Sequence, residues 1–187
     1  EMELFREWYL QRHLNLSLTV QQQELLDSVF QLLAESALAQ PRVFVHRDYH
    51  SRNLMVTSDN NPGILDFQDA VIGPVTYDLV SLLRDCYIDW PRDQVEQWAL
   101  SYLRRAAEAG VFELTADCTD DVLLRWFDWM GVQRHLKASG IFARLSLRDG
   151  KNGYLGDIPR TLNYVTDVCA RYEELAPLQI LLETLDN

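Results

Sequence analysis

Apolar residues recur along most of this chain at the three- and four-residue spacing of an amphipathic helix. The pattern begins with Leu4, Phe5, Trp8 and Tyr9 and continues in similar runs to the end of the sequence. The spacing predicts helices over residues 3–13, 20–39, 77–87, 92–109, 120–139, 141–147, 158–175 and 177–185. The chain is therefore expected to be mainly helical.

Residues with known capping or helix-breaking roles stand where several of these helices should begin or end. Thr19 is a predicted N-cap, because its hydroxyl can accept a hydrogen bond from a backbone N–H of the first turn. Pro41 should stop the helix that follows Thr19, and Gly110 should close another. Asp157 precedes Pro159, which suits the first turn of a helix.

One stretch departs from the helical spacing. Residues 43–45 form a short apolar run that predicts a buried strand end, and residues 54–56 and 64–65 predict two further short strands. Residues 59–63 read Asp-Asn-Asn-Pro-Gly, which favours a tight reversal. We expect a small β-hairpin with polar groups at the ends of its strands, followed by a loop over residues 68–75. The fold class is thus α+β and mainly helical.

Composition narrows the possible partners and compartment. The 187 residues include 17 basic and 28 acidic side chains, and the net charge of −11 disfavours binding to nucleic acid or anionic membranes. No apolar run approaches membrane-spanning length, and no signal peptide is visible. Cys86, Cys118 and Cys169 are few, odd in number and far apart, which fits a reducing cytoplasm. The length allows one domain or one large lobe.

The polar groups around the predicted hairpin suit phosphoryl transfer. That reaction needs a carboxylate to orient the attacking hydroxyl and oxygen ligands to hold Mg²⁺ on the phosphates of ATP. Asp48 can take the first role, and Asn53 and Asp66 supply the hard oxygen donors for the second. Residues 46–53 match the kinase catalytic-loop pattern H-R-D-x-x-x-x-N, and Asp66 begins an Asp-Phe-Gln where that pattern expects Asp-Phe-Gly.

Three segments together resemble the aminoglycoside phosphotransferase and choline kinase superfamily, the small-molecule relatives of protein kinases. Its members commonly read H-G-D-x-H-x-x-N, then I-D-F or I-D-W, then G-P-x-x-Y-D-L. The corresponding segments here are residues 46–53, residues 65–67 and residues 73–79. Arg47 replaces the usual glycine, which is a departure toward the protein-kinase form. The resemblance implies the C-terminal lobe of a protein-kinase-like fold, with the small hairpin carrying the catalytic loop.

The resemblance also assigns roles to residues outside the catalytic set. It implies that His46, Arg47 and Asp78 support the loop, although Asp78 could instead complement a helix dipole. Four further residues are candidate contacts for the acceptor substrate: His50, Asp69, Arg84 and Asp85. His50 could equally brace the loop, and Arg84 and Asp85 could pair with another lobe.

The N-terminal lobe of a kinase is not visible in these residues. A kinase needs a Gly-rich loop and a lysine to cover the nucleotide phosphates, and neither precedes residue 46. We therefore expect residues 1–187 to form the catalytic and substrate-binding lobe of a longer enzyme. The isolated lobe is expected to be inactive.

The segment after Asp66 bears on the acceptor. About ten residues separate Asp66 from the helix predicted at Tyr77, and no Ala-Pro-Glu follows, which leaves little platform for a polypeptide. A small hydroxylated acceptor is therefore expected. Residues 82–91, 140–145, 148–151 and 154–155 look like the anomeric N-acetylmuramate/N-acetylglucosamine kinases of bacterial cell-wall recycling. This similarity implies ATP-dependent phosphorylation of the sugar C1 hydroxyl.

Three alternatives remain open at this point. The enzyme could act on an aminoglycoside, choline or homoserine. The chain could be a non-catalytic nucleotide-binding module, although such a module has no need of Asp48, Asn53 and Asp66 together. It could also be a folded scaffold without activity of its own.

Overall fold

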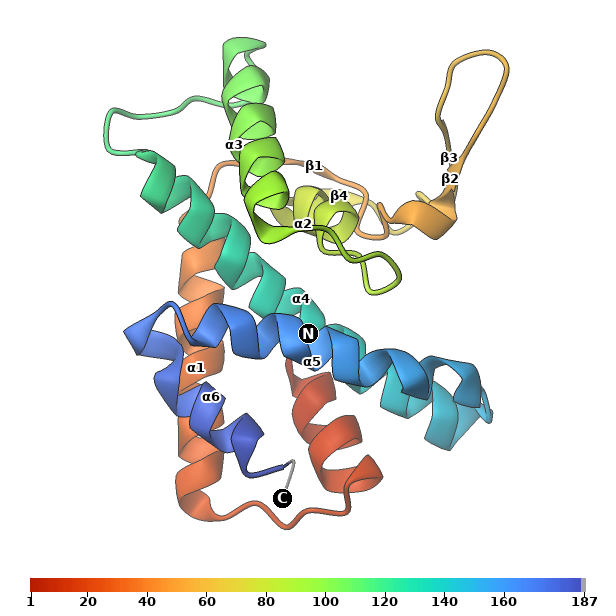
Figure 1. The fold of residues 1–187 in the computed structure, drawn as a ribbon, viewed down its shortest axis with the longest axis vertical. Helices are drawn as coiled ribbons and strands as arrows, with labels where there is room; N and C mark the ends of the chain where they lie inside the picture. Colours follow the sequence, from red (N-terminus) through yellow and green to blue (C-terminus); the bar gives the residue numbers. More distant parts are fainter. Residues whose placement is uncertain (186–187) are drawn as a thin grey trace. The chain divides into compact units, whose positions relative to one another are not determined.

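The computed structural model describes residues 1–185, which divide into two compact units. Unit 1 comprises Glu1–Glu35 and the chain from Gly131 onward, and unit 2 comprises Ser36–Met130. Both divisions fall inside long helices, α1 (Val20–Leu38) and α4 (Asp120–Asp149), which contribute residues to both units (Figure 1).

Unit 1 is built from helical segments around an apolar core. Besides its parts of α1 and α4, it contains η1 (Phe5–His13), η3 (Asn152–Asp157), α5 (Ile158–Cys169), η4 (Glu173–Leu175) and α6 (Ala176–Glu183). Its largest fully buried side chains are Phe5, Leu10, Leu26, Leu33, Leu136, Leu175 and Leu178. The predicted helices of this unit are therefore present, although η1 is a π-helix.

The start of α1 shows why a helix forms where the sequence predicts one. The Gln22 N–H donates to the Thr19 hydroxyl at 3.2 Å, and the Thr19 N–H donates to the Gln22 side-chain oxygen at 2.9 Å. This reciprocal pair is a capping box, which satisfies two backbone donors that the first turn leaves without partners. The predicted N-cap role of Thr19 is confirmed.

Helix α4 corrects one boundary, because the predicted helices 120–139 and 141–147 are one continuous helix. Gly140 lies inside it, where a glycine lowers helix propensity without ending the helix. A Cβ atom at Gly140 would lie 2.2 Å from the Leu4 carbonyl carbon. The glycine therefore permits a close backbone approach instead of marking a break.

Two other helices are shorter than predicted. The helix predicted over residues 77–87 ends at Leu83 as α2 (Tyr77–Leu83), and the one predicted over residues 158–175 ends at Cys169. Cys169 itself is 2% exposed, and this burial raises the pKa of its thiol to about 12. In both cases, apolar residues continue at helical spacing after the helix has ended, because the turns that follow also bury apolar side chains. The spacing alone therefore overestimates the length of the helix.

Unit 2 contains all the strands. They are β1 (Arg42–Val45), β2 (Leu54–Met55), β3 (Gly63–Ile64) and β4 (Val71–Pro74). β1 pairs antiparallel with β4, and β2 pairs antiparallel with β3, so the predicted hairpin is present. The loop predicted over residues 68–75 is wrong, because β4 lies there and completes a sheet with β1 across 25 intervening residues.

The β1–β4 sheet has one buried and one exposed face. Val45 is 2% exposed, whereas the cross-strand neighbours Phe44 and Ile72 are 69% and 58% exposed. The prediction of a buried strand end therefore holds for Val45 and is wrong for Phe44. Alternate residues of a strand point to opposite faces, so one strand can carry both buried and exposed side chains.

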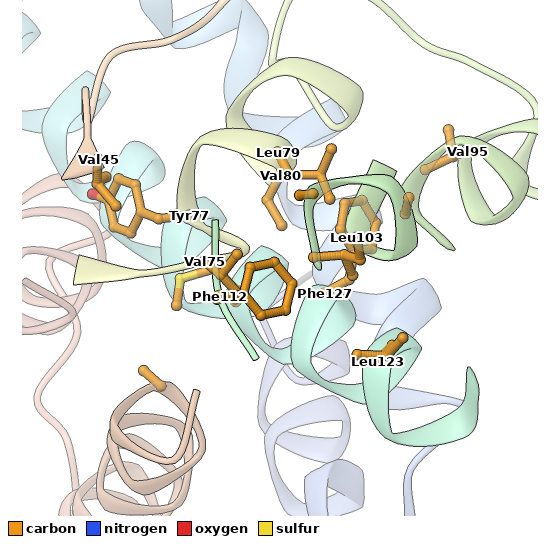
Figure 2. Close-up of a cluster of buried hydrophobic side chains, with 14 residues drawn as sticks. Val45, Val75, Tyr77, Leu79, Val80, Val95, Leu103, Phe112, Leu123 and Phe127 are labelled. Atoms are coloured by element: carbon orange, nitrogen blue, oxygen red, sulfur yellow. The ribbon is translucent and has the colours of Figure 1, made fainter. Parts of the chain in front are cut away.

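The core of unit 2 joins β1 to helices α2, α3 (Arg92–Glu108) and the first part of α4. Figure 2 shows Val45, Tyr77, Leu103 and Phe127 among the side chains of this cluster. This packing fixes β1 and α2, which lie next to residues 46–53, the candidate catalytic loop. In the described part of the chain, no helix has the length and apolar character needed to cross a bilayer.

Candidate active site

The candidate catalytic loop, residues 46–53, begins where β1 ends. The His46 ring is 5% exposed, and its Nδ1 accepts a hydrogen bond from the Asp48 N–H at 3.3 Å. Arg47 has φ = +78°, a left-handed conformation that glycine adopts most easily. The glycine of the H-G-D pattern would adopt this turn with less strain than Arg47 does.

Asp78, in the first turn of α2, bonds directly to this turn. Its carboxylate accepts the His46 N–H at 2.6 Å and the Arg47 N–H at 2.9 Å. Hydrogen bonds to a charged acceptor contribute about 1.5–3 kcal/mol each. The first part of the loop is thus attached to the packed helix α2.

Asp85, beyond the end of α2, bonds to the second part of the loop. Its carboxylate is 3% exposed and accepts hydrogen bonds from the Ser51 N–H at 2.9 Å, the Ser51 hydroxyl at 2.5 Å and the Tyr87 N–H at 3.0 Å. The sequence suggested Asp85 as an acceptor contact. Its burial and its three donors instead favour a role in holding the loop.

Asp48 stands between these two attachment points. Its backbone oxygen accepts the His50 N–H at 3.0 Å and the Asn53 side-chain N–H at 2.9 Å. Its carboxylate is half-buried and accepts no hydrogen bond from any residue in the range 1–185. A fixed backbone with an uncommitted carboxylate is what a group needs to accept the proton of a bound hydroxyl.

Asn53 and Asp66 face each other across the base of the β2–β3 hairpin. The Asn53 Nδ2 lies 3.5 Å from Asp66 Oδ2, and Gln68 Nε2 donates to Asp66 Oδ1 at 2.7 Å. Asp66 has φ = +66° and is exposed. Within residues 1–185, no three His, Cys, Asp or Glu side chains gather into a metal-holding group. A cation bound here would be held by the Asp66 carboxylate and the Asn53 amide oxygen. Its other ligands would come from bound molecules such as a nucleotide or water.

The remaining predicted contacts are dispersed around the loop. The His50 ring meets the edge of the Tyr87 ring at 5.9 Å, and Arg84 is half-buried at the end of α2. Asp69 is exposed in the turn before β4. Asp69 is therefore open to solvent, whereas His50 packs against Tyr87.

Sequence reasoning missed several residues that complete the site. Ser51, Arg52 and Tyr87 interact with one another or with Asp85, and Gln68 bonds to Asp66. Ser51 and Arg52 stand inside the catalytic-loop pattern, at positions that the pattern leaves unspecified. Tyr87 carried no signal of its own, because only the fold brings it to the loop.

The hydroxyl of Tyr102 in α3 has a pKa that is raised above its ordinary value. Burial raises the pKa of its hydroxyl, and the nearby Asp78 carboxylate and Tyr49 raise it further. The Tyr102 hydroxyl therefore stays protonated at neutral pH.

A loop with an HRD-type aspartate, an asparagine and a following Asp-Phe matches the pattern of kinases and related phosphotransferases. The chain belongs to the phosphotransferase enzyme family, whose pattern matches residues 1–116.

Curated relatives share one name. The N-acetylmuramate/N-acetylglucosamine kinase of Neisseria meningitidis serogroup B is 50% identical over 185 residues, which are 99% of this chain and 54% of that protein. The kinase of the same name from Pseudomonas putida is 51% identical, over 99% of this chain and 53% of that protein. That of Caulobacter vibrioides is 35% identical over 75% of this chain and 37% of that protein. The chain thus spans about half the length of the first two.

Proposed function

We propose that this chain is the catalytic and substrate-binding lobe of a longer ATP-dependent kinase that phosphorylates the anomeric hydroxyl of N-acetylmuramate and N-acetylglucosamine. One observation carries the proposal. The uncommitted Asp48 carboxylate lies in a loop that Asp78 and Asp85 hold at both ends, beside Asn53 and Asp66. The relatives named above support the choice of sugar. Their greater length supports a second lobe outside residues 1–187.

Asp48 acts as the general base in this proposal. Its carboxylate orients the C1 hydroxyl and accepts its proton as the hydroxyl oxygen forms a bond to the γ-phosphorus of ATP. The bond between that phosphorus and the β,γ-bridging oxygen breaks, and ADP leaves with the electron pair. Asp78 and Asp85 keep the Asp48 backbone in place during the transfer.

The oxygen donors at Asn53 and Asp66 fit Mg²⁺ bound with ATP. Mg²⁺ is commonly held by one or two carboxylates together with substrate phosphates and water, and here Asp66 would supply the carboxylate and Asn53 an amide oxygen. When bound, the ion would neutralise charge on the phosphates. Asn53 Nδ2 is engaged by the Asp48 backbone oxygen, which leaves the amide oxygen for the cation.

Other features of the proposal concern the acceptor and the compartment. His50, Arg84 and the exposed Asp69 remain candidates to contact ring hydroxyls, whereas Asp85 is committed to Ser51. The free thiols of Cys86, Cys118 and Cys169 suit the reducing cytoplasm, where ATP is abundant.

A substrate panel tests the proposed function. Full-length enzyme is assayed with both amino sugars, their methyl glycosides, an aminoglycoside, choline and homoserine, and ³¹P NMR identifies the product. We expect sugar 1-phosphates, and no turnover of methyl glycosides, whose C1 oxygen is blocked. Turnover of a methyl glycoside, or phosphate at C6, would reject anomeric transfer and leave the kinase assignment intact. Turnover of another acceptor alone would reject the amino sugar.

A further inference from the structure

Arg52 is an exposed arginine inside the catalytic loop, four residues after Asp48. Its guanidinium carbon lies over the Tyr87 ring, 3.4 Å from the ring centroid. No carboxylate of residues 1–185 forms an ion pair with it, although the chain as a whole carries a net charge of −11. A cation without a counter-ion in a strongly acidic chain is a good candidate to bind an anionic ligand.

The surroundings of Arg52 hold it in place before any ligand binds. Tyr87, the ring beneath it, is attached to Asp85 through its backbone N–H at 3.0 Å. The same buried carboxylate binds Ser51, the residue before Arg52, through two hydrogen bonds. One carboxylate thus fixes both the backbone and the stacking surface of the arginine. Such preorganisation lowers the entropy that an arginine loses when it binds.

Arg52 and the candidate metal ligands contact different neighbours. Ser51–Asn53 form a single turn of 3₁₀-helix, in which successive side chains leave the axis about 120° apart. Asn53 faces Asp66, whereas Arg52 faces Tyr87. The guanidinium is therefore directed to a different side of the loop from the oxygen donors proposed for the nucleotide's cation. This direction favours an anion on the acceptor over the phosphates of ATP.

We propose that Arg52 binds the carboxylate of an acidic sugar acceptor. The inference rests on the proposed function and extends it, because it makes Arg52 the residue that separates the two amino sugars. N-acetylmuramate carries a lactyl carboxylate that N-acetylglucosamine lacks. A planar guanidinium can meet a carboxylate with two parallel hydrogen bonds, and stacking on Tyr87 leaves its N–H edge open for them.

The test compares ligands that differ only in charge. The full-length enzyme and its Arg52→Gln variant are assayed with N-acetylmuramate, the corresponding lactyl carboxamide and N-acetylglucosamine. For each enzyme, kcat/KM for the acid is divided by kcat/KM for the amide. We expect Arg52→Gln to lower this ratio by about tenfold or more, mainly through a higher KM for the acid. Arg52→Lys should recover part of the ratio, because lysine restores the positive charge but lacks the planar pair of N–H donors.

Two further variants separate a specific contact from a general effect. Arg104→Gln removes another exposed arginine of the same unit, one that pairs with Asp120, and should leave the ratio at the wild-type value. Tyr87→Leu removes the stacking surface and should lower the ratio, whereas Tyr87→Phe keeps the ring and should not.

The outcomes distinguish this inference from the function on which it rests. A ratio that Arg52→Gln leaves within about twofold of wild type would overturn the carboxylate assignment while the kinase stands. Equal losses with all three ligands would also overturn it, because they would place Arg52 on the phosphates or in loop support. Failure of the wild-type enzyme to phosphorylate any of the three sugars would overturn both proposals.

Discussion

The catalytic loop and the hairpin that follows it carry neighbouring parts of the same candidate site, yet the protein holds them in different ways. Two carboxylates of unit 2, Asp78 and the buried Asp85, bind the backbone of the loop at both ends. The hairpin pairs only two residues in each strand. In the hairpin and the residues directly after it, five apolar side chains are substantially exposed: Met55, Val56, Ile64, Leu65 and Phe67. Figure 1 shows the hairpin projecting away from helices α2 and α3 of the same unit.

In the proposed mechanism, this difference separates the positioning of the base from the positioning of the metal ligand. The position of Asp48 is set by the packed protein, through α2 and β1. The position of Asp66 is set by local contacts with Asn53 and Gln68. In the proposed mechanism the base is therefore preorganised by the fold, whereas the metal ligand depends also on the partners that the nucleotide brings.

The largest expected effect comes from the base. Asp48→Asn should lower kcat by about 10²–10⁴-fold, because an amide cannot accept the proton. It should change the free energy of unfolding by less than about 0.5 kcal/mol, since the carboxylate has no hydrogen bond to lose. Steady-state kinetics and urea unfolding measure the two effects. Turnover within about twofold of wild type would remove Asp48 from the base role.

The metal ligands should give the next largest effect. Asp66→Ala should lower activity by about a hundredfold, because it removes the anionic ligand. Asn53→Ala should cost less, and raised Mg²⁺ should partly restore it. Activity measured against Mg²⁺ concentration checks both expectations. Identical curves for wild type and the two variants would show that neither residue holds the ion.

Loss of a loop attachment should appear in stability. Asp85→Asn replaces a carboxylate that accepts three hydrogen bonds, and we expect a loss of about 3 kcal/mol in the free energy of unfolding. Asp59→Asn is the matched control, because Asp59 lies exposed in the hairpin turn and should change stability by less than about 0.5 kcal/mol. Urea unfolding measures both. Equal changes in the free energy of unfolding for the two variants would contradict the contrast between the loop and the hairpin.

The smallest effects come from one substitution made at two places. Val45→Thr puts a hydroxyl into the core beside the loop, at a side chain that is 2% exposed, and should cost about 1–3 kcal/mol. Val56→Thr makes the same change in the hairpin at a side chain that is 96% exposed, and should cost less than about 0.5 kcal/mol. Thermal unfolding of the two variants compares them directly. A larger cost at Val56 would show that the hairpin is packed as tightly as the strand.

Local patterns in the sequence predicted much of this fold. Helical spacing found the helices, the Thr19 capping signal placed the start of α1, and turn residues located the β2–β3 hairpin. The catalytic-loop spacing identified residues that the structure brings together, since Asn53 bonds to the Asp48 backbone and faces Asp66. These features depend on interactions between residues close in sequence, which local patterns record.

The features that the sequence did not reveal depend on interactions between residues that are far apart in the sequence. β4 exists because β1 pairs with it, and Val71–Pro74 alone is too short to signal a strand. Asp85 looked like an acceptor contact because a carboxylate on an apolar helix suggests a cleft. Only the folded chain shows that Ser51, 34 residues earlier, occupies it. Tyr87 became part of the site for the same reason.

Gly140 imposes an evolutionary constraint on unit 1. The backbone of α4 passes so close to Leu4 that even the smallest side chain would come within 2.2 Å, below the 3.0 Å that real Cβ contacts respect. A descendant of this protein could replace the glycine only if the segment that begins at Leu4 moved with it. The two positions are 136 residues apart, and they can change only together.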